Sequence, residues 1–296
     1  MTRHARQHQA GVTLVELILV IALIGIIGGV LTMQLAPAIN SYLLVGQRAA
    51  MTNQADAALR RIVADVRSAV PNSLRLGSGE CLELVPTKDG GRFRTAPHTG
   101  NNAVATAYLD DVDARSEFDV LSGFTNPPVQ GDAIVIGNQN TADVYNGANV
   151  GIVDTVTLNA EGAAGTHRIR LAQGNVAPGS RELRLPGGYE GGRFLVVPQA
   201  QKSVSYLCTG AGVDPATGSG TGTLYRFTSA SLQAAPSCQL PQQAAVLADR
   251  VAHCAFQYSA GQGSTQESGF VQLQLTLADK GESVPLIIGA HVDNLP

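Results

Sequence analysis

The residues of this sequence that could do chemistry are few and scattered. The spacings typical of catalytic and nucleotide-binding sites, C-x-x-C, H-E-x-x-H, G-x-S-x-G and G-x-x-x-x-G-K-S/T, do not occur. His253 adjoins Cys254, but no second close pair of metal-ligand residues accompanies it. Neighbouring residues of a strand face opposite sides of a sheet, so we expect His253 to face solvent. The sequence therefore predicts no enzyme, no metal site and no cofactor.

A second group of candidates is a run of carboxylates at Asp110, Asp111 and Asp113, with Glu117 and Asp119 nearby. Carboxylate oxygens are the ligands that Ca²⁺ prefers. The run lacks the glycine and the spacing of an EF-hand loop. We interpret it as a solvated acidic loop, with calcium binding as the alternative.

The third candidate is Glu16, the single charged residue in an apolar run from Val12 to Ala36. At about 1.5 Å per residue this run forms a helix of roughly 37 Å, enough to cross a bilayer. A carboxylate in hydrocarbon costs on the order of 2 kcal/mol or more, so such a group is usually functional and paired. The plainer alternative is a signal anchor in which Glu16 lies at the membrane interface.

The segment before the apolar run indicates whether the apolar helix is removed or retained after cleavage. A secretory signal has its small-residue cleavage site after the apolar core, which is then discarded. Here the small residue Gly11 lies before the core, after a polar segment that contains Arg3 and Arg6. We therefore expect the helix to be retained. With these arginines on the cytoplasmic side, the rest of the chain should face the periplasm or the cell exterior.

The stretch GVTLVE at residues 11–16 resembles the class III signal of type IV prepilins and type II secretion pseudopilins. In that signal Gly, usually Phe, Thr, Leu, a hydrophobic residue and Glu precede an apolar helix; this sequence has Val12 where Phe is commonest. The resemblance implies cleavage after Gly11 by a prepilin peptidase, N-methylation of Val12 and retention of the helix.

The same resemblance gives Glu16 a role in assembly. The new α-amino group of Val12 is a cation near neutral pH, and the Glu16 carboxylate of a neighbouring subunit could neutralise it. Gly25 and Gly29 are four residues apart, and such small residues let helices approach closely. The alternative is that glycine is simply common in membrane helices.

Beyond the apolar run, the pattern predicts an amphipathic helix that ends at Pro71, so that one long helix extends over Thr13–Ala69. Its predicted apolar stripe consists of Leu59, Ile62, Val63, Val66 and Val70. Pro37 removes a backbone donor, and we expect a kink or local melting near residues 33–37.

After residue 71 the period changes to two, which predicts a mostly antiparallel sheet. The predicted strands are 81–85, 133–136, 155–158, 167–171, 193–197, 203–208, 224–228, 251–258, 270–277 and 284–292. We expect the strands at 193–197 and 203–208 to pair through Pro198, and the last two to form a hairpin. Residues 86–130 are predicted to be irregular, 209–222 to be a flexible insertion, and 241–250 to hold a short helical turn.

Charge and cysteine content add two expectations. Residues 1–70 carry six Lys/Arg and three Asp/Glu, whereas residues 71–296 carry 14 and 20, a net negative charge that does not attract nucleic acid. The four cysteines, Cys81, Cys208, Cys238 and Cys254, are compatible with two disulfides. Three connectivities are possible, of which we prefer Cys208–Cys238 with Cys81–Cys254, since the first pair brackets a loop-like stretch.

Later segments narrow the resemblance. Several segments resemble MshO-type minor pilins of the mannose-sensitive haemagglutinin (MSHA) pilus. They are NSLRLGSGECLELVP, RFLVVPQAQKSVSYLC with TLYRF after it, ADRVAHCAFQYS and HVDNLP. The likeness covers both ends of the chain and is poor over residues 95–190.

The predicted fold is α+β and type IV pilin-like. The predicted organisation is a leader peptide at residues 1–11, a transmembrane half-helix at 12–36, an amphipathic half-helix at 37–70 and a β-rich periplasmic or extracellular domain at 71–296.

The resemblance implies an inner-membrane protein of a Gram-negative bacterium that becomes a minor filament component and primes or modulates pilus assembly. The implied partners are prepilin peptidase, other pilin subunits and the inner-membrane assembly platform. One alternative is a minor pseudopilin of a type II secretion system, and another is a membrane-anchored periplasmic enzyme or binding protein. An adhesive role is also conceivable, with the loops at 86–130 and 209–222 as contact surfaces.

Overall fold

The computed structural model describes residues 11–97, 107–160, 165–172, 182–187, 189, 191–261 and 268–295. The chain forms two compact units, Met1–Ala50 and Met51–Pro296, and the first helix contributes to both. The elements are α1 (Leu14–Arg67), β1 (Arg75–Ser78), β2 (Cys81–Leu84), β3 (Asp89–Arg92), β4 (Glu117–Val120), β5 (Ala133–Val135), α2 (Thr141–Asn146), β6 (Val150–Leu158), β7 (His167–Leu171), β8 (Arg193–Val197), β9 (Ser203–Thr209), β10 (Gly222–Ser229), β11 (Ala245–Ser259), β12 (Ser268–Asp279) and β13 (Glu282–Asp293).

α1 is a single helix of 54 residues, close to the predicted span. It continues through Pro37 without a break, so the predicted local melting is wrong, whereas the alternative of a kink stays a prediction. Proline removes one donor from the backbone ladder of a helix, and here the remaining bonds of a long helix keep the segment helical. From residue 14 to 50 the described side chains are exposed, apart from Gln47, which is half-buried.

In the second unit, α1 buries one stripe, as its periodicity predicts. Leu59, Ile62 and Val66 are almost fully buried, and Val63 is partly buried against the same cluster. The stripe begins earlier than expected, because three further residues are buried: Met51, Ala55 and Ala58.

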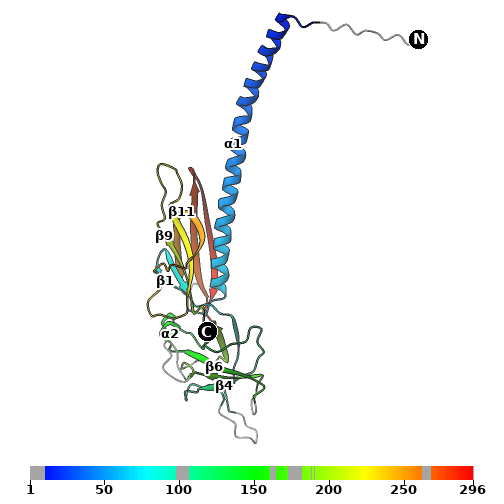
Figure 1. Ribbon diagram of the computed structural model, residues 1–296. Helices are drawn as coiled ribbons and strands as arrows, with labels where there is room; N and C mark the ends of the chain where they lie inside the picture. Colours follow the sequence, from blue (N-terminus) through cyan, green and yellow to red (C-terminus); the bar gives the residue numbers. More distant parts are fainter. Residues whose placement is uncertain are drawn as a thin grey trace, which may run out of the picture. The chain divides into compact units, whose positions relative to one another are not determined.

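This stripe packs on a seven-stranded antiparallel sheet with the order β1-β2-β9-β10-β11-β12-β13. Figure 1 shows the second half of α1 alongside the orange and red strands of this sheet. In β12 the alternate residues Val271, Leu273, Leu275 and Leu277 are buried. The α+β class is thus observed: a long apolar helix is followed by a mostly antiparallel sheet domain.

The predicted hairpin at the end of the chain is confirmed as β12 and β13, which pair from Asp279↔Glu282 to Ser268↔Asp293. Its two turn residues, Lys280 and Gly281, have φ of 51° and 84°, the left-handed conformation that two-residue hairpin turns favour. Because Asp279↔Glu282 closes the turn, Pro285 falls at a position whose N–H would point to the open edge. Proline is therefore tolerated in this edge strand.

Six other strands form a second sheet, in the order β3-β8-β5-β6-β7-β4, drawn mainly in green in Figure 1. They lie in sequence between β2 and β9, which are neighbours in the first sheet. The second sheet is therefore an insertion into the first. Two of its strands, β3 and β4, fall in the segment that the sequence predicts to be irregular.

Two local expectations are corrected, and one contact is added. Strand β8 pairs with β3 and β5, whereas β9 pairs with β2 and β10, so the expected pairing through Pro198 is wrong. Strand β11 begins at Ala245, where a helical turn is expected. The loop before β10 is fastened to the β12–β13 turn, since Gly281 donates to the Gly218 carbonyl over 3.1 Å.

Candidate functional site

The start of α1 carries the residues that the sequence identifies as functional. Thr13 precedes the helix, and its Oγ1 accepts a hydrogen bond from the Glu16 backbone N–H at 3.3 Å. The Thr13 carbonyl accepts the first helical bond, from Leu17 at 3.1 Å. Thr13 is thus the N-cap of α1, and Glu16 places a carboxylate in the first turn, where the helix dipole favours negative charge. This capping role of Thr13 is additional to the sequence interpretation, although T-x-x-E is a known cap pattern.

Gly11 and Val12 lie in the non-helical segment just before α1. Val12 is 70% exposed, and nothing lies within 4 Å of where a Cβ on Gly11 would be. The bond between them is therefore accessible and outside the helical hydrogen-bond ladder. Cleavage and methylation at this bond remain predictions.

Among the residues that the structure describes, Glu16 has no charge partner nearby. It is exposed, and the next charged residue along the chain is Arg48. At about 1.5 Å per residue the helix carries that arginine roughly 48 Å away. A cation for the Glu16 carboxylate therefore has to come from the segment that precedes α1 or from another molecule.

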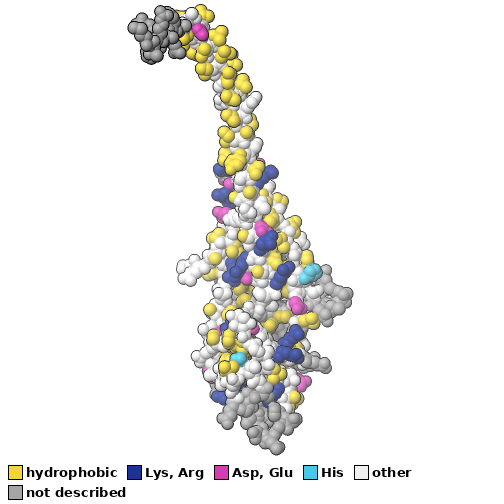
Figure 2. Space-filling model, turned by 90° about the vertical axis from the view of Figure 1, so that its right-hand side faces the viewer, with side chains coloured by type: hydrophobic (Ala, Val, Ile, Leu, Met, Phe, Trp, Pro, Cys, Tyr) yellow, Lys and Arg dark blue, Asp and Glu magenta, His cyan; other side chains and the backbone are white. Residues whose placement is uncertain are grey.

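The first unit exposes a nearly continuous apolar surface along α1, from Val12 to Val45. Figure 2 shows hydrophobic side chains covering this part of the helix. Of the described helices, α1 alone is long and apolar enough to cross a membrane, and none of its most apolar window is buried. The exposed surface includes Ile39, Tyr42 and Leu43, and so continues beyond the predicted transmembrane boundary at residue 36.

Gly25 and Gly29 lie on this exposed segment, together with Gly28. Nothing lies within 4 Å of the Cβ position of any of the three. The backbone is therefore open to close approach by another helix, and the expected packing role of these glycines stays a prediction.

The other half of α1 is joined to its sheet by a polar contact of Asp65, which lies on the helix between the buried residues Ile62 and Val66. The carboxylate of Asp65 accepts hydrogen bonds from the Tyr206 hydroxyl at 2.6 Å and from Arg226 Nε at 2.9 Å. Both carboxylate and guanidinium side chains are mostly buried. Burial and the bond to Asp65 raise the pKa of Tyr206 well above its ordinary value.

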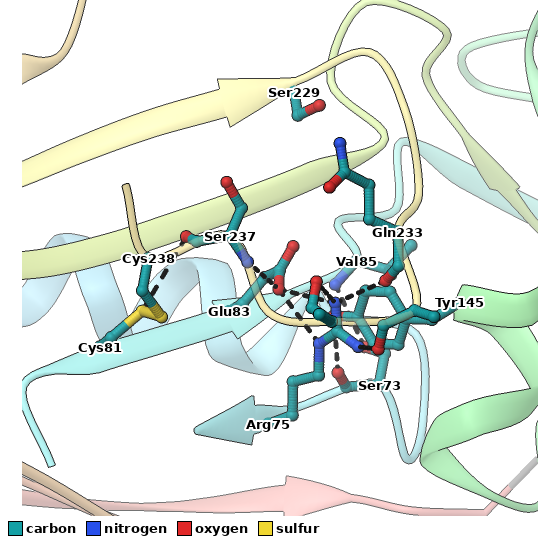
Figure 3. A network of polar contacts seen from close by, with 12 residues as sticks. Ser73, Arg75, Cys81, Glu83, Val85, Tyr145, Ser229, Gln233, Ser237 and Cys238 are labelled. Atoms are coloured by element: carbon teal, nitrogen blue, oxygen red, sulfur yellow. Dashed lines mark hydrogen bonds and ion pairs between the residues drawn. A yellow bond between two sulfur atoms is a disulfide. The ribbon is translucent and has the colours of Figure 1, made fainter. Parts of the chain in front are cut away.

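A second polar cluster joins the inserted segment to the first sheet (Figure 3). The Arg75 guanidinium donates to Glu83 at 2.8 and 3.0 Å, and its carbon lies 3.3 Å from the centre of the Tyr145 ring. The Tyr145 hydroxyl donates to the Ser73 carbonyl at 2.9 Å. Because Tyr145 belongs to α2, in the insertion, this cluster connects the inserted segment to β1 and β2.

The same guanidinium holds a loop on the first sheet. It donates to three consecutive carbonyls, those of Gln233, Ala234 and Ala235, at 2.7–3.0 Å. Beside it, the Ser237 N–H donates to Glu83 at 3.1 Å. Figure 3 shows the disulfide that follows in this loop.

The disulfides differ from the preferred pairing: they are Cys81–Cys238 and Cys208–Cys254, with Cα separations of 5.9 and 6.4 Å. Cys81 lies opposite Leu207 in the β2–β9 pair, so the next residue, Cys208, faces the other side of the sheet. Cys208 and Cys254 both lie in the cluster beneath α1, whereas Cys81 and Cys238 lie in a separate cluster. Which cysteines form a disulfide is therefore decided by the face of the sheet on which they lie, and not by the loop between Cys208 and Cys238.

The acidic run at residues 110–113 contacts a cationic side chain of the same chain, that of Arg115. Asp110 accepts hydrogen bonds from the backbone N–H groups of Val112 and Asp113 at 3.1 and 2.8 Å, and these lower its pKa. Arg115 lies 3.7 Å from Asp110 and 3.0 Å from Asp113. In the described ranges no group of three or more His, Cys, Asp and Glu residues is placed to hold a metal ion. His253 is exposed, as predicted.

Comparison with known proteins bears on the start of α1. The model of the prokaryotic N-terminal methylation motif matches residues 6–32. No curated protein and no solved structure matches the chain. The match contains Gly11, Val12 and Glu16 and none of the β-rich unit.

The motif supports a type IV pilin-like or pseudopilin-like protein in general. It implies processing by a prepilin peptidase and assembly with other pilins, and it indicates a structural subunit rather than an enzyme. Together with the exposed apolar helix, it indicates anchoring in a membrane and incorporation into a pilus.

Proposed function

We propose that this chain is a minor type IV pilin that takes part in assembly or priming of an MSHA-type pilus. The observation that carries the proposal is a methylation motif at the head of a long, exposed apolar helix whose carboxylate, Glu16, has no cation nearby among the described residues. A helix of this kind is incomplete in isolation, and neighbouring helices of the same kind complete it.

The residues of the motif then take defined roles. A prepilin peptidase cleaves after Gly11 and methylates the new α-amino group of Val12. That amine supplies the cation for Glu16 of an adjacent subunit, so that two groups unfavourable in apolar surroundings are present only as a pair. Gly25 and Gly29 allow neighbouring helices to approach closely.

The location follows from charge and cysteine chemistry. Arg3 and Arg6 keep the leader on the cytoplasmic side of the inner membrane, so the β-rich unit enters the periplasm. Both disulfides lie in that unit, as expected for an oxidising compartment of a Gram-negative cell.

The test is incorporation into filaments by wild-type protein and by Glu16→Gln, followed in surface filaments sheared from host cells. We expect the wild-type chain in the sheared fraction, and a processed Glu16→Gln chain that stays in the membrane. Equal incorporation of both proteins would show that Glu16 has no part in assembly.

Deleting the gene identifies the assembly system. An MSHA-type minor pilin predicts loss of surface filaments with secretion intact. A pseudopilin predicts the reverse, with exported proteins retained in the periplasm.

A further inference from the structure

Two arginines of the inserted sheet lie directly opposite each other on adjacent strands. Arg92 of β3 is the register partner of Arg193 of β8, so both side chains project from the same face. The neighbouring pair is hydrogen-bonded, since Phe93 donates to the Gly192 carbonyl at 2.9 Å. Arg92 and Arg193 therefore form a non-hydrogen-bonded pair, the kind whose side chains lie closer together.

Like charges in such positions repel each other, and no carboxylate in the described part of the chain neutralises this pair. Most arginines that the structure describes have a carboxylate partner, such as Arg168 with Asp119 at 2.7 Å. Arg92 and Arg193 are both exposed, and neither forms an ion pair with any described carboxylate. The carboxylate at the start of β3, Asp89, is occupied by backbone N–H groups of Gly90 and residues 125–126.

The two guanidinium groups border a groove of about 400 Å³. Its remaining lining is small or neutral: Gly90, Gly91, Ser122, Gly123, Phe194 and Leu195. None of these lining residues is a carboxylate that could pair with the arginines. Nothing lies within 4 Å of where a Cβ on Gly123 would be, so the groove is open at that residue. Ser122 Oγ accepts the Arg92 N–H at 3.0 Å, which fixes the loop after β4 against β3.

A third cation lies in the adjoining cavity, of about 260 Å³, which shares Arg193, Phe194 and Leu195 with the groove. Arg67, in the last turn of α1, lines this cavity and also lacks a described carboxylate partner. The one carboxylate in its wall, Asp293, accepts the Leu295 N–H at 3.1 Å.

We propose that the groove between Arg92 and Arg193 is a binding site for an oxyanion, a phosphate or a carboxylate group. A planar guanidinium presents paired donors that match these groups, and an anion between the two arginines replaces their repulsion with two attractions. This site lies in the inserted sheet and does not depend on the proposed role in pilus assembly.

The experiment measures the melting temperature of the full chain in detergent with inorganic phosphate, with galacturonate or with neutral galactose. Sodium chloride at equal ionic strength is the reference. Phosphate or galacturonate should raise the melting temperature above that reference, and galactose should not. A shift with phosphate alone identifies a phosphate ligand, and one with galacturonate alone a carboxylate.

Arg92→Gln and Arg193→Gln should each need roughly tenfold more anion for the same shift, since one charged hydrogen-bonding group is lost. Arg184→Gln is the matched control, because Arg184 is exposed, has no described ion pair and does not line the groove. Arg193→Lys serves if Arg193→Gln does not fold. No shift in the wild type, or the same shift in all variants, overturns the proposal.

Repulsion between the arginines gives a second readout that needs no ligand. In low salt, Arg92→Gln should melt at a higher temperature than the wild type, because the substitution removes one of two opposed like charges. A lower or unchanged melting temperature would show that the pair is already relieved, and the argument for an anion would fail.

Discussion

Glu83 is a carboxylate with 1% of its side chain exposed, and Arg75 makes that burial tolerable. The guanidinium satisfies the charge, stacks on Tyr145 and holds three carbonyls of one loop. A buried ion pair is weak evidence for stability by itself, but removing one member leaves an uncompensated charge. Arg75 is thus a residue on which several elements depend.

Arg75→Ala should lower the free energy of unfolding by about 3–5 kcal/mol, because Glu83 would remain buried without its cation. Denaturant unfolding measures this. Arg60→Ala is the control, since Arg60 forms an exposed pair with Asp56 on α1 and its loss should change little. Equal effects of the two substitutions would contradict the role given to Arg75.

Tyr206 predicts a specific dependence on alkaline pH. Its pKa is raised in the folded state, by burial first and by the hydrogen bond to Asp65 next. Above about pH 10 an unfolded chain releases this proton while the folded chain keeps it, so stability should fall as pH rises. The measurement is the free energy of unfolding from pH 9 to 11. Tyr206→Phe should show a smaller fall than the wild type, and an identical fall would refute the assignment.

Whether an important residue can be recognised from the sequence depends on how far along the chain its partners lie. Glu16 is identifiable because a charge in an apolar run is conspicuous without any partner. Asp65 is not, because its partners Tyr206 and Arg226 are far along the chain. Helical periodicity places Asp65 beside arginines on the polar face and contains no information about which sheet residues will meet it.

Among the elements, the strands with local pairing could be predicted. The hairpin of β12 and β13 follows from alternation and an adjacent turn, and β7 and β8 match their predicted bounds. Strand β3 has the sequence DGGR, which carries no strand pattern, and exists because β8 pairs with it. The partners of β8 and β9 could not be predicted, because consecutive strands here belong to different sheets.

The disulfides give a test at the element scale. Peptide mapping of the oxidised protein should find Cys81 linked to Cys238 and Cys208 linked to Cys254. Replacing both Cys208 and Cys254 by serine should lower the free energy of unfolding by about 2–5 kcal/mol, because the disulfide restricts the conformational freedom of the unfolded chain. A peptide joining Cys208 to Cys238 would contradict the assignment of these residues to opposite faces.

For the molecule as a whole, the expectation of an MSHA-type minor pilin, which rests on the sequence alone, is weakest over the inserted sheet. The likeness is poor over residues 95–190, which lie within the insertion between β2 and β9. Most of the segments that carry the likeness lie in the seven-stranded sheet, but RFLVV, at residues 193–197, is β8 of the inserted sheet. The range of poor likeness therefore falls within the insertion, which also contains Arg92 and Arg193.

The central claim is that cleavage after Gly11 makes Val12 the new N-terminus, just ahead of α1, and that the exposed part of α1 functions in contact with other helices. Its most direct test is the N-terminal residue and its mass, measured by mass spectrometry on protein purified from the host membrane. The account predicts a chain that begins at monomethylated Val12. A chain that begins at Met1, or one cut after the apolar run, would contradict prepilin processing and leave Glu16 in need of another partner.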